Sequence, residues 1–112
     1  MKVKIQNNTV AAPLTGVRPG IRVDAGNNTA GEDAAVCVNL SGNTSAGSGG
    51  TQGLGLRKQG TTPTTNDFGI HGLPGGSTAT PNVEAYVNGQ NPAGGGTLLI
   101  SATSGFSTCS LP

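Results

Sequence analysis

The first half of the chain repeats itself at an offset of 35 residues. Self-similarity of this kind indicates repeated structural units before it indicates any chemistry. Each unit reads as a short apolar strand, a turn at Asn-Thr, a passage of small residues and a second strand that begins at Gly. The repeat therefore predicts one coil of a solenoid, present twice. The identical pairs are Val3/Val38, Asn8/Asn43, Thr9/Thr44, Ala11/Ala46, Gly20/Gly55 and Arg22/Arg57, and the similar pairs are Ile5/Leu40 and Ile21/Leu56.

The composition favours a β fold with a thin core. Apolar residues make up 33% of the 112 residues, against about 45–50% in an average globular domain. Disorder would also require a high net charge, but the formal charge is only +1. A near-neutral chain with 20 glycines and many Thr and Asn residues is typical of a repetitive β structure, in which backbone ladders supply much of the order.

Alternation of apolar and polar residues predicts where the strands lie. Residues 3–5 and 20–23 are the expected strands of the first unit, and residues 34–40 and 53–57 those of the second. Asn7 and Asn8 end the first strand, because Asn tolerates a left-handed backbone and its side chain bonds locally. Residues 41–44 form the equivalent turn in the second unit.

The repeat ends after Gly60, and the pattern changes. Residues 67–73 predict a weak strand. Thr80 as N-cap, Pro81 at the first helical position and Gly89 as a left-handed terminator predict a two-turn helix. A hairpin turning at Asn88-Gly89 is the alternative. We favour the helix because its start and stop signals agree with its apolar spacing at Val83, Tyr86 and Val87.

A last strand is expected at residues 97–101. Leu98 would then stack over Val3 and Val38 as a third rung, with Ile100 over Ile5 and Leu40. Residues 106–109 would return beside Cys37.

The two cysteines, Cys37 and Cys109, lack a metal-ligand spacing, and with a single His they do not predict a metal site. They are either two buried thiols or one disulfide. We expect the disulfide, because the composition is typical of an extracellular protein and such bonds persist in oxidising compartments. It would close a loop of 73 residues, counted from Cys37 through Cys109. The loop-entropy model assigns about 4 kcal/mol to that closure.

Charge and hydropathy argue against several partners. Six scattered Lys and Arg residues are too few for a surface that follows nucleic-acid phosphates. No stretch approaches the ~20 apolar residues of a membrane span. Lys-Val-Lys-Ile follows Met1 without a long apolar region, so no signal peptide is expected, and Met1 reads as an added start codon on an excised fragment. No cofactor is expected.

Residues 5–10, 38–44 and 55–57 resemble coils of right-handed parallel β-helix proteins, in which a strand ends at a stacking Asn. The whole chain is similar to terminal parts of large secreted bacterial β-helix or β-strand-repeat surface proteins. The resemblance implies an all-β fold: a right-handed parallel β-helix (β-solenoid) fragment of two to three coils, with a short capping helix near residues 81–88. It also implies one domain, 1–112, with two coils in 2–60 and an irregular insertion, the helix and a closing strand in 61–112.

Catalytic candidates are few. The carboxylates are Asp24, Glu32, Asp33, Asp67 and Glu84. Glycoside cleavage would need two of them facing one groove, and Asp24 and Asp67 are the pair that could share a face. His71 near Asp67 suggests an acid/base pair. For these residues we favour ordinary roles in turns and at the surface. Arg22 and Arg57, expected side by side, could contact an anionic sugar, although outward-facing solubilising residues are the simpler reading.

Three functions remain. The first is a non-catalytic structural or adhesive segment of a secreted, cell-surface protein. Its open end would pair with preceding coils of a parent protein or with another copy in an end-to-end assembly, and surface glycans are further candidate partners. The second is a carbohydrate-binding or carbohydrate-active β-helix, although aromatic stacking platforms are scarce. The third, ice binding by threonine rows at residues 61–65, lacks coil spacing.

Overall fold

The computed structural model describes residues 1–26, 29, 34–59, 67–75, 80–101 and 105–112. Within these residues the chain forms nine strands and one helix. Asn27, Glu32, Asp33 and the threonine-rich residues 61–65 lie outside this part. The elements are β1 (Lys2–Gln6), β2 (Thr9–Val10), β3 (Ile21–Ala25), β4 (Ala35–Ser41), β5 (Thr44–Ser45), β6 (Leu54–Lys58), β7 (Asp67–His71), α1 (Thr80–Gln90), β8 (Thr97–Ser101) and β9 (Ser107–Cys109).

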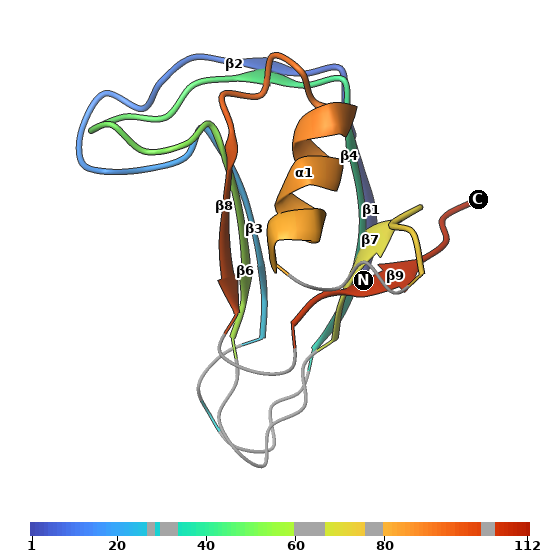
Figure 1. The fold of residues 1–112 in the computed structure, drawn as a ribbon. Coiled ribbons are helices and arrows are strands. Elements are labelled where there is room, and N and C mark those ends of the chain that lie inside the picture. The colour runs from blue at the N-terminus through green and yellow to red at the C-terminus, as the bar shows by residue number, and fades with distance from the viewer. Residues whose placement is uncertain (27–28, 30–33, 60–66, 76–79, 102–104) are drawn as a thin grey trace.

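The strands form three separate sheets in which every pair is parallel (Figure 1). The largest has the order β1-β4-β7-β9, the second has the order β3-β6-β8, and β2 and β5 pair alone. The offset seen in the sequence is the true register of two pairs. Val3 lies opposite Val38 in β1 and β4, and Thr9 lies opposite Thr44 in β2 and β5.

The same offset gives the wrong register for the second strand of the unit. Ile21 lies opposite Leu54 rather than Leu56, and Arg22 lies opposite Gly55 rather than Arg57. Side chains alternate with a period of two along a strand, so a shift of two residues keeps the same face inward. Both registers, the one predicted by the 35-residue offset and the observed one, place the apolar side chains on the core face. The identical pairs Gly20/Gly55 and Arg22/Arg57 favoured the predicted register, which is wrong.

The predicted third rung is also wrong. Leu98 lies opposite Gly55 in the β3-β6-β8 sheet, whereas the residue opposite Val38 is Ile70 of β7. Val3, Val38 and Leu98 therefore do not form one column. The strand at residues 67–71, which the sequence pattern marked as weak, takes that position because Phe68 and Ile70 are buried in the core.

These findings overturn the expected right-handed parallel β-helix of two to three stacked coils. The strands belong to three separate sheets of four, two and three strands instead of one continuous winding. The spacing between paired strands is also not constant: Ala35 pairs with Asp67, 32 positions later, but Leu54 pairs with Thr97, 43 positions later. Insertions and the helix separate the later strands, so the 35-residue unit does not continue beyond its second occurrence.

The helix is where the sequence predicted it, and the hairpin alternative is wrong. α1 spans Thr80–Gln90, and its Val83 and Val87 side chains are fully buried. Gly89 is inside the helix and has no positive φ, so it is not the expected left-handed terminator. The side chain of Asn91 ends the helix by donating from Nδ2 to the Val87 carbonyl at 2.9 Å.

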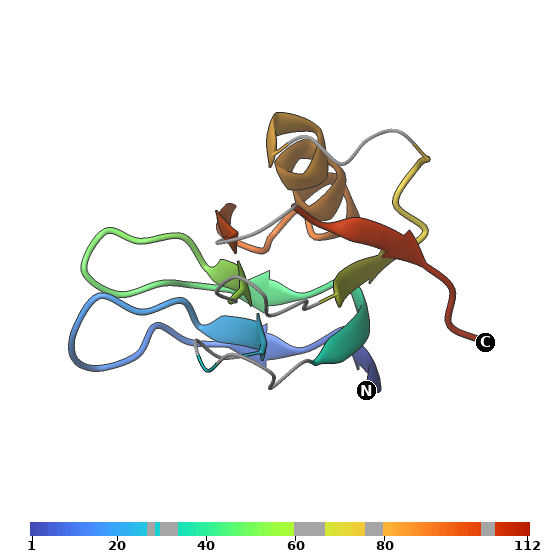
Figure 2. The same ribbon diagram turned by 90° about the horizontal axis from the view of Figure 1, so that it is seen from below.

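α1 does not act as a clear cap. It lies between the two larger sheets in Figure 1, and Figure 2 shows it on the side of the molecule opposite to β1 and the N-terminus. Its buried face adds to one apolar cluster that also includes both larger sheets, and Tyr86 donates a hydrogen bond to the His71 carbonyl at 3.0 Å. Phe68 and Phe106 pack edge to face in the same cluster, with ring centroids 5.2 Å apart.

Candidate functional site

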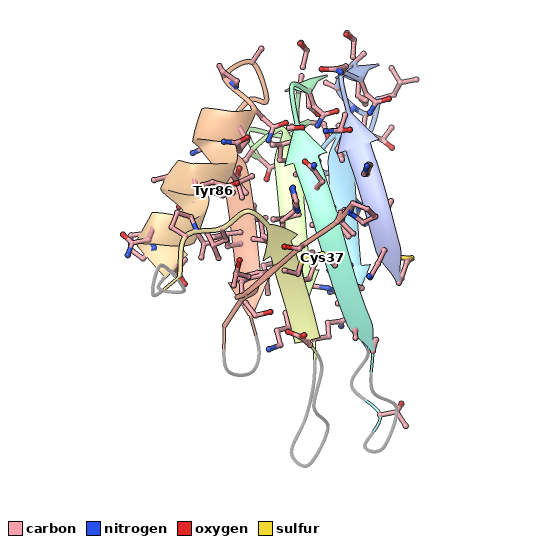
Figure 3. All side chains as sticks on the ribbon, turned by 90° about the vertical axis from the view of Figure 1, so that its right-hand side faces the viewer. Cys37 and Tyr86 are labelled. Carbon is pink, nitrogen blue, oxygen red and sulfur yellow. A yellow bond between two sulfur atoms is a disulfide. The ribbon has the colours of Figure 1, made fainter. Side chains whose placement is uncertain are left out.

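Cys37 and Cys109 form the predicted disulfide, with their Cα atoms 6.0 Å apart. The bond links β4 to β9 across β7, which lies between them (Figure 3). Gly69 of β7 lies directly beneath it. A Cβ atom at Gly69 would lie 2.7 Å from the Cβ of Cys109 and 2.8 Å from its Sγ. The disulfide can therefore cross the middle strand only because residue 69 has no side chain.

A row of three asparagines runs through the molecule at the turn after β1 and β4. Asn43 is buried at its centre, and its Oδ1 accepts from the backbone N–H of Asn8 at 3.0 Å and from Asn8 Nδ2 at 3.1 Å. Asn43 donates in the same way to Oδ1 of Asn91, from its backbone N at 3.0 Å and from Nδ2 at 2.9 Å. Each step of the row thus uses a backbone donor and a side-chain donor on one amide oxygen.

The turn that precedes the row has a left-handed residue in both repeats. Asn7 has a φ of 57° and Gly42 a φ of 66°, which bears out the expectation that Asn adopts this conformation here. The third asparagine has a different origin, because Asn91 follows a helix rather than a strand. Its Nδ2 also donates to the Leu40 carbonyl at 2.8 Å.

The row is open at the Asn8 end. Asn8 is exposed, and no donor to its Oδ1 occurs among the residues that the structure describes. Every other asparagine in the row presents that oxygen to two donors of its neighbour. Asn8 therefore has room for one more step of the same bonding pattern.

The strands next to Asn8 are open as well. Within the described part of the chain, β1 and β3 are edge strands of the two larger sheets and β2 pairs with β5 alone. All three lie on the side away from α1 (Figure 2). The Met1 carbonyl accepts from Cys37 N, and Asn7 N donates to the Ser41 carbonyl. Backbone groups of successive residues in a strand point to opposite neighbours. Odd-numbered residues of β1 therefore bond to β4, and Lys2, Lys4 and Gln6 direct their N–H and C=O groups to the other edge. There the Gln6 carbonyl already accepts from Nδ2 of Asn8 at 3.1 Å.

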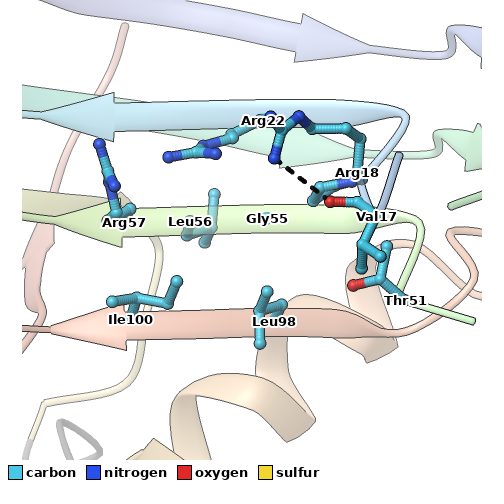
Figure 4. A pocket seen from close by; sticks show the side chains of 10 residues that line it. Val17, Arg18, Arg22, Thr51, Gly55, Leu56, Arg57, Leu98 and Ile100 are labelled. Carbon is cyan, nitrogen blue, oxygen red and sulfur yellow. Dashed lines mark hydrogen bonds between the residues drawn. The ribbon is translucent and has the colours of Figure 1, made fainter. Parts of the chain in front are cut away.

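A pocket of about 210 Å³ lies on the outer face of the β3-β6-β8 sheet. Figure 4 shows Arg22 and Arg57 on one side of it and Leu98 and Ile100 of β8 on the other, with Gly55 between them. The loop that carries Val17, Arg18 and Pro19 closes one end.

Charge in this pocket is concentrated around a single carboxylate. Arg22 donates to Asp24 through Nε at 2.9 Å and Nη2 at 3.0 Å, and Nη2 of Arg57 lies 3.4 Å from the same carboxylate. The hydrogen bond with Asp24 raises the pKa of Arg22 above its usual value; burial opposes this shift, and the charge of Asp24 adds to it. Nε of Arg57 is buried and has no hydrogen-bond partner.

The two carboxylates considered as a candidate catalytic pair lie in different sheets. Asp24 lies in β3 and Asp67 begins β7, and these strands belong to different sheets. Asp67 accepts a hydrogen bond from Ser107 Oγ at 2.6 Å. His71 is bonded to the C-terminal segment, since its Nδ1 accepts from Leu111 N at 2.9 Å. Glu84 is exposed on α1. The described carboxylates therefore have structural or surface positions, as the simpler reading expected.

Two further findings concern the described part of the chain. No group of three His, Cys, Asp or Glu side chains there is arranged to hold a metal ion. The helix found in that part, α1, is too short and too polar to cross a bilayer.

The comparisons with known proteins identify no relative: no family model, curated protein or solved structure matches this chain. The resemblance to secreted β-helix surface proteins thus stays a prediction.

Sequence reasoning missed the two residues that complete these arrangements. Asn91 is 48 positions after Asn43, outside the repeat, so the 35-residue offset could not find it. Gly69 lies in a Gly-interrupted strand pattern, and an isolated Gly in a strand is a signal of close approach by another chain segment. Together with the two cysteines, that signal could have indicated that a disulfide passes over Gly69.

Proposed function

We propose that this chain is a non-catalytic structural segment of a secreted or cell-surface protein, and that its open face accepts further β-strands. The observation that carries the proposal is the coincidence of three open strand edges, β1, β2 and β3, with the open end of the asparagine row on one side of the molecule. An edge strand offers unpaired N–H and C=O groups as a template for another strand.

The side chains of β1 indicate which kind of strand can pair with it. Val3 and Ile5 are half buried and direct their side chains toward the core, while Lys2 and Lys4 are exposed. Two copies pairing antiparallel at β1 would bring lysines together, and like charges opposite each other destabilise a sheet. The fitting partner is a parallel strand with apolar residues on the core side, uncharged residues on the outer side and an Asn after the turn. β4 itself has this pattern.

The setting outside the cell is supported by the disulfide. A disulfide bond in a small domain is compatible with an extracellular location, because reducing compartments keep thiols free. An adhesive role would use the same exposed surfaces. A carbohydrate-active role has no support from a carboxylate pair, since Asp24 and Asp67 lie in different sheets.

A peptide with the sequence of residues 34–46, with Ser in place of Cys37, tests the proposal. Isotope-labelled protein is titrated with this peptide while backbone amide signals are recorded. We expect saturable shifts at Lys2, Lys4, Gln6 and Asn8, and slowed exchange of the amides that face the free edge. A scrambled peptide of the same composition is the control.

Two substitutions at one residue separate edge pairing from other binding. Lys4→Pro removes a free-edge N–H without removing a bond to β4, and Pro is tolerated in edge strands. Lys4→Ala keeps the N–H and removes the same charge. Peptide binding that survives in Lys4→Ala and is lost in Lys4→Pro supports strand addition. Equal binding by both variants, or no shifts in β1 with the unmodified protein, would overturn it. Sedimentation at several concentrations shows whether a second copy can occupy the face instead.

A further inference from the structure

The pocket on the outer face of the β3-β6-β8 sheet is built by the register of its strands. Arg22, Gly55 and Leu98 lie in one row across the sheet, and Asp24, Arg57 and Ile100 lie in the next outward-facing row. In the first row Gly55, which has no side chain, lies between a cationic and an aliphatic residue. In the second, a cation lies between a carboxylate and an aliphatic side chain.

The space next to Gly55 is taken by Pro19, which forms one wall of the pocket. A Cβ atom on Gly55 would lie 2.7 Å from Cγ of Pro19. The loop before Pro19 is fixed by Ser48, whose N donates to the Arg18 carbonyl at 2.9 Å and whose Oγ donates to the Gly16 carbonyl at 2.7 Å. The pocket is therefore shaped by hydrogen-bonded backbone rather than by freely moving side chains.

The charges of the pocket do not balance. Three arginines, Arg18, Arg22 and Arg57, surround it, and Asp24 is the one carboxylate paired with them among the described residues. Asp24 is used by Arg22 through two hydrogen bonds, so Arg57 receives only a longer contact at 3.4 Å. A buried guanidinium N–H without an acceptor is costly, and Nε of Arg57 is such a group.

We propose that this pocket binds a small organic carboxylate with a short aliphatic body. The carboxylate accepts hydrogen bonds from Arg57, and the aliphatic body covers Leu98 and Ile100. A guanidinium matches a planar carboxylate through two parallel hydrogen bonds. The exposed Ile100 side chain supplies apolar contact near Arg57, and Val17 supplies it at the other end of the pocket.

Other anions fit less well. The pocket wall opposite the arginines is aliphatic and contains no aromatic side chain, whereas a sugar ring is usually held against an aromatic face. The pocket is on a different face from the β1 edge, so this inference goes beyond the proposed strand addition and does not depend on it.

Titration with hexanoate, followed by backbone amide and arginine Nε NMR signals, tests the site. We expect saturable shifts at Gly55, Arg57, Leu98 and Ile100, with a dissociation constant on the order of 1 mM, as suits a ligand of this size. Hexanamide, which has the same body without the charge, and acetate, which has the charge without the body, are expected to bind at least about 10-fold more weakly.

Two variants and a matched control complete the test. Arg57→Gln removes the charge and Ile100→Asn removes the apolar wall, and each is expected to weaken hexanoate binding by about 5-fold or more. Lys2→Gln removes the same charge from β1 and should leave binding unchanged. Amide spectra of each variant verify folding, and Arg57→Lys serves if Arg57→Gln fails to fold. Hexanoate shifts that are absent, equal to those of hexanamide, or unchanged in folded Arg57 and Ile100 variants would overturn the proposal.

Discussion

Gly69 shows at the scale of a single residue how an absent side chain permits a covalent bond. The disulfide between Cys37 and Cys109 joins two strands that are not neighbours, and its path passes over the strand between them. The space that a Cβ of residue 69 would need is filled by Cys109. Gly69 is therefore required by the bond rather than by its backbone conformation, since its φ is not positive.

Gly69→Ala is expected to prevent or strongly slow formation of the disulfide, because the added Cβ and Cys109 would occupy the same space. Thiol titration of the purified, air-oxidised variant checks this and should find two free thiols in most molecules. Gly75→Ala, at a glycine with no atom within 4 Å of the added Cβ, is the control and should oxidise normally. Complete oxidation of Gly69→Ala would show that β7 can move aside.

Asn43 is a second single residue on which several buried hydrogen bonds depend. It is 1% exposed and bonds to both neighbouring asparagines and, through Nδ2, to the Ile5 carbonyl at 2.8 Å. Asn43→Ala leaves several buried polar groups without partners, at roughly 1–3 kcal/mol each. We expect urea denaturation to show a loss of at least about 2 kcal/mol in the free energy of unfolding. Asn8→Ala, at the exposed end of the row, should cost less than half as much. Equal losses would show that the row is not centred on Asn43.

At the scale of elements, α1 is stabilised by the core it covers rather than by its own sequence. No acidic residue lies in its first turn and no basic residue in its last, and it contains one Pro and one Gly. Its order depends on Val83 and Val87, which are buried beside β4 and β8.

Val87→Ala is expected to lower the free energy of unfolding by about 2 kcal/mol, since it removes two buried methyl groups and leaves a cavity. Glu84→Ala, on the exposed side of the same helix, should change it by less than about 0.5 kcal/mol. Thermal or urea denaturation of the two variants provides the comparison. Similar effects of both substitutions would mean that the helix does not depend on its packing.

The sequence predicted the positions of most strands and of the helix along the chain. It did not predict which strands pair with each other or in which register. Period-two alternation located β1, β3, β4 and β6, and the N-terminal signals Thr80 and Pro81 located the start of α1, because both kinds of signal are local. Pairing of β6 with β8 joins Leu54 to Thr97 across an insertion and a helix. No local pattern records which strand lies next to which. Leu98 was therefore assigned to the wrong sheet, although its strand was predicted correctly.

The candidate sites follow the same division. The disulfide was predictable because two cysteines allow one pairing, and Asn8 and Asn43 were visible in the repeat. Arg22 and Arg57 were recognised in the sequence as a possible contact for an anion, but they were expected side by side. The pocket itself was not predictable, because it depends on Arg22 lying opposite Gly55 rather than Arg57, a shift that alternation cannot detect.

On the scale of the whole molecule, the disulfide holds together a chain with a small core. It closes most of the sequence into one loop, and its removal frees the unfolded chain from that constraint. Cys109→Ser is expected to lower the free energy of unfolding by about 4 kcal/mol, as measured by urea denaturation of oxidised proteins. A dithiothreitol-treated wild-type sample is the matched control and should behave like the variant. A loss below about 1 kcal/mol would mean that the sheets alone determine stability.

The two sides of the molecule differ in how many of their strand edges are paired or covered. α1, β8 and β9 finish one side, and β1, β2 and β3 leave backbone groups open on the other (Figure 2). This asymmetry is the basis of the proposed structural role, because one side is already covered by the chain itself and the other is proposed to pair with more strands.

Amide hydrogen exchange along β1, measured residue by residue with and without the residue 34–46 peptide, tests this account most directly. In the free protein, we predict protected amides at Val3, Ile5 and Asn7 and fast exchange at Lys4 and Gln6. Addition of the peptide should slow exchange at Lys4 and Gln6 and leave the odd-numbered residues as they were. Fast exchange at Lys4 and Gln6 that saturating peptide does not change would contradict the open edge as a docking surface.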